Sequence, residues 1–414
     1  MAIADGYGND DFVPVILGTG LGAYTIARSL HMAYGVRSLA LGRARLGETA
    51  HSAILDVIEV PNFDQPDTVI ATLREVAGKF PTRRPILFST IEMYSTIIAE
   101  HHDELARLYT LPCIDAEAQR TLAEKDHFYA ACDRAGLVYP TTDVLGPGDV
   151  CDQARLDARG LTFPLILKPT NTDIYPRLNF AGRKKVYLIS TLDELVSTIA
   201  RIRAGGYDDG LILQRYLSGN ESVMRVANTY SDTDGRLRAI CVGQVAVTDR
   251  HPQRVGNNNA IVALRDDALT EKIRSFLDAH NYRGFANFDF LLDRDSGDYH
   301  VLEANLRLGA SSFYTLAGNV NLVRHCVDDM VYGSPRPFEA AEQAGLWMTI
   351  PYPVVRRHCA PELRPLVTEA ASHRRLHTLW YSKDLSPQRV VSNLRMDARL
   401  SRDTLRYAEA ELNS

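Results

Sequence analysis

Two segments late in the chain, 287–293 and 299–305, constrain the fold more than any other feature because they place polar side chains at alternate positions. Alternate residues of a β-strand share one face, so Asp289 on the first segment and Glu303 on the second would each lie on a polar face backed by apolar residues. The polar stretch 293–298 between the segments is suited to a turn. The sequence therefore predicts a hairpin with one buried and one functional face.

The polar face of this hairpin carries a set of side chains suited to a divalent cation. Asp289, Glu303 and Asn305 would converge at the ends of the two strands. Two carboxylates and an amide oxygen are hard ligands of the kind that Mg²⁺ prefers. Arg307 would lie on the same side, where it could bind a phosphate oxygen. The alternative is a solvated hairpin whose outer face is merely polar, and the buried opposite face favours the metal site.

The start of the chain alternates strands with helices, which predicts a parallel α/β layer. The expected elements are strands at 12–17, 36–41 and 85–88 and helices at 23–34 and 69–80. The cluster Gly18, Gly20 and Gly22 follows the first strand, but Ala23 stands where a dinucleotide fingerprint needs its third glycine. We therefore favour a tight structural turn over dinucleotide binding.

The middle of the chain is rich in strands and has few helices, which predicts a largely antiparallel sheet. A helix is expected at 116–135, and a second one after a capping box of Ser190 or Thr191 with Glu194. Further elements are strands at 163–169, 185–189, 211–217, 222–229, 238–247, 286–292 and 299–304 and a helix at 267–280. The α/β (α+β) chain is thus expected to divide into 1–115, 116–335 and 336–414, the last an extension rich in Pro, Arg and His.

Composition excludes several classes of protein. The chain has 414 residues with 46 Lys plus Arg and 51 Asp plus Glu, so its formal charge of -5 gives no overall reason to bind nucleic acid. None of the 6 cysteines forms a C-x-x-C pair. No apolar run is long enough to span a membrane, and no signal peptide is evident. We expect a cytoplasmic protein with reduced thiols.

Several residues at strand ends could bind a nucleotide. Lys168 ends a strand that faces the expected cleft, and Lys125 lies in the preceding helix, although either alone would resemble a surface lysine. The segment Gln214, Arg215, Tyr216 and Leu217 ends another strand, where backbone groups could read an adenine edge. Glu221 could reach a ribose hydroxyl, and the stretch 177–185, which ends at Lys185, could fold over the phosphates as a lid.

The order of these motifs resembles the ATP-grasp family. The series comprises Glu124-Lys125-Asp126, Ile166-Leu167-Lys168-Pro169, Leu213 to Leu217 with Gly219 and Glu221, Asn287-x-Asp289, and Leu302 to Arg307. The resemblance covers about 12–330, with the first unit similar to the domain that precedes an ATP-grasp fold. The chain's start at 12–18, the run 27–29 and the overall length most resemble the D-aspartate ligases of peptidoglycan bridge synthesis.

The resemblance implies a role for each motif residue. Lys125, Lys168 and Lys185 would bind the ATP phosphates, and 214–217 would form the adenine hinge with Glu221 on the ribose. Asp289, Glu303 and Asn305 would hold Mg²⁺, with Mn²⁺ as an alternative, and Arg307 would assist phosphoryl transfer. Two departures stand out: the lid has only one glycine, Gly182, and Asn287 stands where some relatives carry an arginine.

The implied activity is ATP-dependent carboxylate–amine ligation through an acyl phosphate, with release of ADP. The partners would be a small-molecule acid and an amine acceptor, such as a peptidoglycan precursor, and the protein could be a homo-oligomer. Arg254 could bind the second carboxylate of D-aspartate, or the turn at His251-Pro252 could be purely structural. The arginines of 356–375 could contact an anionic acceptor or form a solvated face.

Two rival functions remain open at this point. The first is an ATP-grasp ligase for another acid, such as an L-amino acid, or for bicarbonate as in carbamoyl-phosphate synthase. The second is a nucleotide-binding regulator without catalysis, which has no need of the metal-binding set at Asp289, Glu303 and Asn305.

Overall fold

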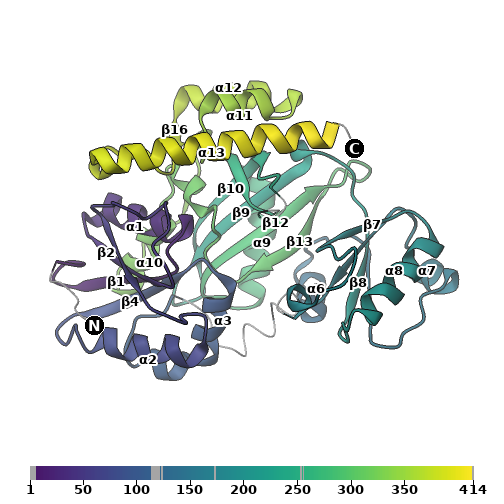
Figure 1. The fold of residues 1–414 in the computed structure, drawn as a ribbon, viewed down its shortest axis with the longest axis horizontal. Helices are drawn as coiled ribbons and strands as arrows, with labels where there is room; N and C mark the ends of the chain where they lie inside the picture. Colours follow the sequence, from purple (N-terminus) through teal and green to yellow (C-terminus); the bar gives the residue numbers. More distant parts are fainter. Residues whose placement is uncertain are drawn as a thin grey trace.

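The computed structural model describes residues 6–112, 122, 125–171, 174–251, 254 and 256–412. Its strands form three sheets, one near the start of the chain, one in a small lobe and one large central sheet. Figure 1 shows the small lobe, with α7 and α8, set apart at the right of the central sheet, and the N-terminal sheet at the left. The mixed α/β class predicted from the sequence is confirmed.

The N-terminal sheet is parallel, as predicted, with strand order β3-β2-β1-β4. Its elements are β1 (Phe12–Leu17), α1 (Leu21–Tyr34), β2 (Ser38–Gly42), β3 (Leu55–Glu59), α2 (Pro66–Ala77), β4 (Arg84–Ser89), α3 (Glu92–Glu100) and α4 (His102–Leu105). The strand β3 was not predicted.

The glycine cluster after β1 has a structural reason. Gly18 has a positive φ of 103°, and a Cβ at Gly22 would lie only 1.9 Å from Oγ1 of Thr90. A side chain at Gly22 would therefore hold α1 away from the segment that follows β4. These glycines allow a tight turn and close helix packing, in agreement with the structural interpretation.

The small lobe is an antiparallel sheet with strand order β5-β8-β6-β7. Its strands and helices are β5 (Thr142–Leu145), α7 (Gln153–Arg159), β6 (Leu165–Pro169), β7 (Tyr187–Ile189), α8 (Leu192–Ala204) and β8 (Leu211–Arg215), with the 3-10 turn Tyr175–Arg177 between β6 and β7. The preceding helix α6 (Lys125–Ala135) packs instead on the core of the central sheet, where Phe128 contacts Phe276. The predicted capping box is present at α8: Oγ1 of Thr191 accepts from the Glu194 amide at 3.2 Å, and the Glu194 carboxylate accepts from the Ser190 amide at 2.8 Å.

The central sheet has the order β13-β12-β9-β10-β11-β15-β16, and all of its pairs along this path except β15–β16 are antiparallel. Its elements up to residue 330 are η2 (Glu221–Val223), β9 (Met224–Ser231), β10 (Leu237–Thr248), β11 (Asn258–Leu264), α9 (Asp267–Ala279), β12 (Gly284–Leu292), β13 (Tyr299–Asn305), η3 (Ser312–Leu316) and α10 (Leu322–Met330). The predicted antiparallel sheet is confirmed, and β11 is an additional strand.

The C-terminal segment continues this sheet. Its elements are β14 (Glu339–Ala340), β15 (Gly345–Met348), α11 (Tyr352–His358), the 3-10 turn Pro361–Leu363, α12 (Arg364–His373), β16 (Arg375–His377), the 3-10 turn Ser382–Asp384 and α13 (Pro387–Leu412). β14 pairs with β10 and β15 with β11. Strands from both sides of residue 335 thus share one sheet, and the domain boundary expected there stays a prediction.

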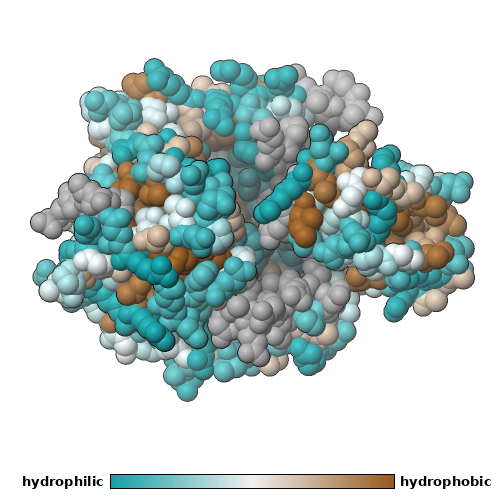
Figure 2. Space-filling view, turned by 60° about the horizontal axis from the view of Figure 1, so that its bottom comes forward, coloured by the Kyte–Doolittle hydropathy of each residue, from teal (hydrophilic) through white to brown (hydrophobic). Residues whose placement is uncertain are grey.

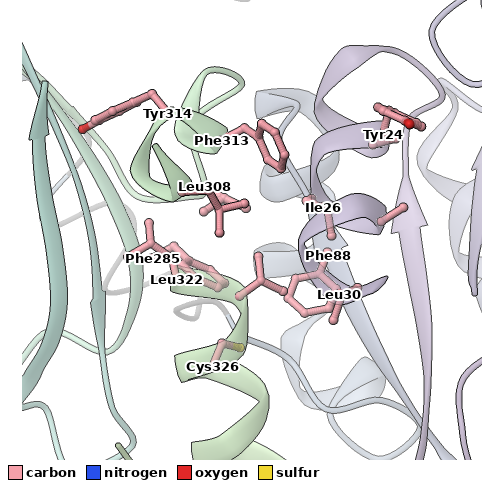
Figure 3. Packing of buried hydrophobic residues seen from close by; sticks show 14 of the residues in the cluster. Tyr24, Ile26, Leu30, Phe88, Phe285, Leu308, Phe313, Tyr314, Leu322 and Cys326 are labelled. Carbon is pink, nitrogen blue, oxygen red and sulfur yellow. The ribbon is translucent and has the colours of Figure 1, made fainter. Parts of the chain in front are cut away.

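One continuous apolar core joins the N-terminal sheet to the central sheet. Figure 3 shows Leu30 and Phe88 on one side facing Phe285, Leu308 and Leu322 on the other. All five side chains are at most 3% exposed. Burying an apolar side chain of this size contributes roughly 1.5–3 kcal/mol, so this contact fixes the two units against each other.

The long helix α13 also bridges the two units, as its path across the top of Figure 1 indicates. Near its start, the fully buried Arg389 donates a 2.8 Å hydrogen bond to the carbonyl of Ala50 in the N-terminal unit. Farther along, Asp403 pairs with Arg254 of the segment between β10 and β11. Helix α13 thus holds the N-terminal unit at one end and the segment between β10 and β11 at the other.

Candidate active site

The predicted hairpin forms, and the structure supplies its register. β12 and β13 pair Asn287 with Asn305 and Asp289 with Glu303, with a bulge immediately after Asp289. The amide of Asn305 donates to Oε1 of Glu303 at 3.3 Å. The structure therefore brings the three proposed metal ligands together.

The two facing carboxyl groups of this hairpin, Asp289 and Glu303, form a site that favours a bound cation. The pKa of the Asp289 carboxyl is raised well above its usual range, because burial and the facing Glu303 carboxylate both disfavour its charged form, while Arg307 and Lys185 act in the opposite direction. Two carboxylates held side by side in this way are stabilised as anions by a bound divalent cation. The donor set of two carboxylates and one amide oxygen fits Mg²⁺.

A buried amide pair supports the hairpin from behind. The amide of Asn228, which is fully buried in β9, donates to Oδ1 of Asn287 at 2.9 Å, and its own Oδ1 accepts from the backbone amide of Gly309 at 3.3 Å. Sequence reasoning missed Asn228, because β9 carries several polar residues and none of them stands out. The pair fixes the start of the segment that follows β13.

Arg307 lies beside the carboxylates, as predicted. Its Nη2 donates to Oδ1 of Asn305 at 3.4 Å, and its Nε forms an ion pair with Glu92 at the start of α3. Glu92 lies 215 residues away in the chain, so local sequence patterns could not identify it. This ion pair links the candidate phosphoryl-transfer group to the N-terminal unit. Beside it lies a cavity of about 30 Å³, lined in part by both residues.

Two of the three predicted lysines have side chains that the structure describes. Nζ of Lys168 donates to Oε1 of Gln214 at 3.1 Å on the inner side of the small lobe. Lys185 reaches across from the lobe: its Nζ lies 4.0 Å from where a Cβ on Gly256 would be, and its charge acts on Asp289. The side chain of Lys125 lies outside the described residues, although the residue itself begins α6.

The side chains of the expected adenine hinge are engaged within the protein. Nε2 of Gln214 donates to Tyr129 at 3.2 Å and to Thr142 at 2.9 Å. Arg215 forms ion pairs of 2.8 Å with both Asp293 and Asp295. If Gln214 and Arg215 contact adenine, their backbone N–H and C=O groups would therefore make the contacts.

The rest of the expected hinge region is also packed or paired within the protein. Tyr216 is half-buried and Leu217 is buried. The carboxylate of Glu221, the expected ribose contact, accepts from Thr248 at 2.9 Å and pairs with Arg250 at 3.2 Å. Figure 2 shows the surface hollowed between the small lobe at the right and the rest of the molecule.

The chain was compared with known proteins. No family model matches it. It is 31% identical over 391 residues to the D-aspartate ligase of Enterococcus faecium strain Aus0004, covering 92% of this chain and 93% of that enzyme. The chain belongs to the D-aspartate ligase family. It is therefore an ATP-dependent carboxylate–amine ligase with an ATP-grasp fold, as the order of its motifs predicted.

Solved structures of other ATP-grasp proteins share the fold. The L-amino acid ligase of Bacillus licheniformis matches with a TM-score of 0.55 at 15% identity, covering 80% of this chain and 78% of that one. The biotin carboxylase domain of Hydrogenobacter thermophilus 2-oxoglutarate carboxylase, crystallised with Mg-ADP and bicarbonate, gives a TM-score of 0.60 at 14% identity over 80% and 73%. At these identities the likeness concerns the fold alone.

Arg254 is the predicted residue whose surroundings differ most from the expectation. Its Nε bonds Asp249 at 2.6 Å and its Nη2 bonds Asp403 of α13 at 2.7 Å. The guanidinium thus already has two carboxylate partners within the ligase. Its role toward a substrate carboxylate stays a prediction.

Two other expectations concern the ligase as a whole. Each of the cysteines in the described part of the chain, Cys132, Cys151, Cys241, Cys326 and Cys359, is buried and free of disulfides, as predicted. Across the described residues, every helix is too short or too polar to cross a membrane.

Proposed function

We propose that this ligase joins the carboxylate of D-aspartate to the side-chain amine of a peptidoglycan precursor. The observation that carries the proposal is the 31% identity to a D-aspartate ligase along 92% of the chain. The hairpin set of Asp289, Glu303 and Asn305 supports catalysis rather than simple nucleotide binding, because a binding protein has no need of paired carboxylates facing the same point.

The reaction proceeds in two steps. A carboxylate oxygen of the acid attacks the γ-phosphorus of ATP, which forms an acyl phosphate and releases ADP. The amine then attacks the acyl carbon, loses a proton and displaces phosphate, which leaves the amide. Both steps depend on positioning and charge neutralisation, so no side-chain nucleophile is required.

The side chains described above divide these tasks between them. Lys168 and Lys185 bind the phosphates from the side of the small lobe. Asp289, Glu303 and Asn305 would hold Mg²⁺, which when bound neutralises charge on the transferred phosphoryl group. Arg307, kept in place by Glu92, binds an oxygen of that group.

Arg254 is proposed to bind the second carboxylate of D-aspartate. Because Asp249 and Asp403 already occupy the guanidinium, the substrate carboxylate would share it with one of them or displace one. Arg254→Ala should therefore raise the KM for the acid and leave the KM for ATP unchanged. An unchanged KM for the acid would remove this residue from the substrate site.

The deciding experiment measures ADP and phosphate release with D-aspartate, L-aspartate, D-alanine and bicarbonate. Each acid is tested with and without a lysine-containing muropeptide precursor. We expect release to be highest with D-aspartate and to require the amine for amide formation. If D-aspartate gives no more ADP than D-alanine or bicarbonate, the choice of acid is wrong and only the ligase class remains.

A further inference from the structure

Three arginines of the C-terminal segment line one open hollow. Arg356 and Arg357 lie in the last turn of α11, Arg364 begins α12, and together with Pro353 they line a space of about 400 Å³. All three arginines are exposed at the surface. The hollow is within the size range of ligand sites in proteins, roughly 300–1,000 Å³.

The charges of this arginine hollow are not balanced by the protein. Within the described part of the chain, no carboxylate lies within 4.0 Å of the guanidinium nitrogens of Arg356, Arg357 or Arg364, whereas Arg215, Arg254 and Arg336 each have two such partners. Arg356 and Arg357 are favourable at the end of a helix, but Arg364 stands in the first turn of α12, where a positive charge is unfavourable. Like charges gathered without a counterion favour the binding of an anion.

The segment that carries the three arginines contacts the candidate active site next to the hollow. Glu362, between α11 and α12, accepts a 3.1 Å hydrogen bond from Asn220, the residue immediately before Glu221. In the same segment, the thiol of Cys359 donates to the carbonyl of Arg356 at 3.6 Å. The segment that carries the arginines thus packs against the part of the chain proposed to contact the ribose.

We propose that Arg356, Arg357 and Arg364 form a binding site for a diphosphate group carried by the amine acceptor. Planar guanidinium groups bind phosphate oxygens in pairs, and three of them supply more positive charge than a single carboxylate requires. The space also exceeds that of one phosphate. The anion site follows from the arginines alone, whereas its assignment to the acceptor rests on the proposed function.

The first test measures binding of inorganic pyrophosphate by calorimetry, with the nucleotide site filled by a non-hydrolysable ATP analogue. The double variant Arg356→Ala/Arg357→Ala should lose at least about tenfold in affinity, because two charge-assisted contacts are removed. The control Arg107→Ala/Arg283→Ala removes the same charge from exposed positions elsewhere and should bind like the wild type. Equal affinity of the two double variants would overturn the anion site.

A second variant separates charge from geometry. Arg356→Lys/Arg357→Lys keeps both charges but loses the paired donors of the guanidinium, so its affinity for pyrophosphate should fall between those of the wild type and the alanine variant. Affinity equal to that of the wild type would reduce the site to a general electrostatic attraction and overturn the guanidinium-specific part of the proposal.

The second test assigns the anion to its source. Ligase kinetics are measured with an acceptor that carries a diphosphate and with the corresponding phosphate-free peptide. The alanine double variant should raise the KM for the first acceptor about tenfold or more, leaving kcat, the KM for ATP and the KM for the phosphate-free peptide within about twofold. Loss of pyrophosphate binding without a change in acceptor KM would overturn the acceptor assignment and indicate a site for free phosphate. A failure of D-aspartate as substrate would leave the calorimetric result unaffected, so the two proposals can fail separately.

Discussion

Gly309 offers a direct test of how the active-site hairpin is supported. A Cβ at this position would lie 2.9 Å from Oδ1 of Asn228 and 3.0 Å from Oδ1 of Asn287. Ordinary contacts to carbon are about 3.5 Å, so Gly309→Ala forces a displacement of roughly half an ångström. Neither amide can yield easily, because both are buried in adjacent strands and bonded to each other. The displacement must therefore fall on the segment that follows β13.

Two consequences of Gly309→Ala can be measured. Overpacking of this kind costs about 1–3 kcal/mol, which should appear as a lower free energy of unfolding in urea. Arg307 lies two residues before Gly309, and a shift of about 1 Å in a positioning group can lower turnover by up to about 100-fold. We therefore expect kcat for ADP release to fall by about 10- to 100-fold.

The matched control is Gly78→Ala. Gly78 has an ordinary φ of -63°, and the nearest atom to an added Cβ there lies at 3.5 Å. This substitution should leave turnover unchanged and be neutral or stabilising by about 0.4–1 kcal/mol. If Gly309→Ala behaves like Gly78→Ala in both assays, the amide pair does not set the position of Arg307 and the reasoning is refuted.

Three further substitutions test other parts of the site. Glu303→Gln should lower kcat by about 100- to 1,000-fold with the fold intact, because a ligand charge is lost where phosphoryl charge must be neutralised; turnover like that of the wild type would remove Glu303 from the metal site. Lys168→Ala should weaken ATP binding in nucleotide titrations far more than Lys272→Ala, a change at a surface lysine, and equal affinities would place Lys168 outside the phosphate site. Glu92→Gln should change the free energy of unfolding by less than about 1 kcal/mol, since the ion pair is partly exposed. It should nevertheless lower kcat about tenfold as Arg307 loses its orientation, and an unchanged kcat would contradict that role.

Local patterns predicted much of the fold and the centre of the site. The two-residue period of the strands put Glu303 and Asn305 on one face and Asp289 on the neighbouring strand. The exact pairing of Asp289 with Glu303 came only from the structure. The capping box of α8 was equally visible, since it involves residues within four positions of one another. Strand periodicity and helix capping depend on residues close together in the sequence, so they can be predicted without knowing the fold.

Long-range partners could not be predicted in the same way. The pairing of Arg307 with Glu92, and of Arg254 with Asp403, joins residues far apart in the chain whose types are common on any surface. The inward orientation of the Gln214 side chain likewise depends on Tyr129, which lies on another element. The sequence alone identified the candidate site residues. It did not identify the residues that bind and orient their side chains.

The bridging position of α13 bears on how the chain folds as it is synthesised. Arg389 is completely enclosed against the N-terminal unit, and Asp384 accepts hydrogen bonds from Tyr24 and Ser52. The N-terminal unit leaves the ribosome more than 300 residues before the segment that completes it. Until then the surface around Tyr24 is open to solvent, to chaperones or to other nascent chains. A ribosome stalled before residue 384 should hold an N-terminal unit that proteases cleave faster than they cleave the same unit in the released chain of 414 residues.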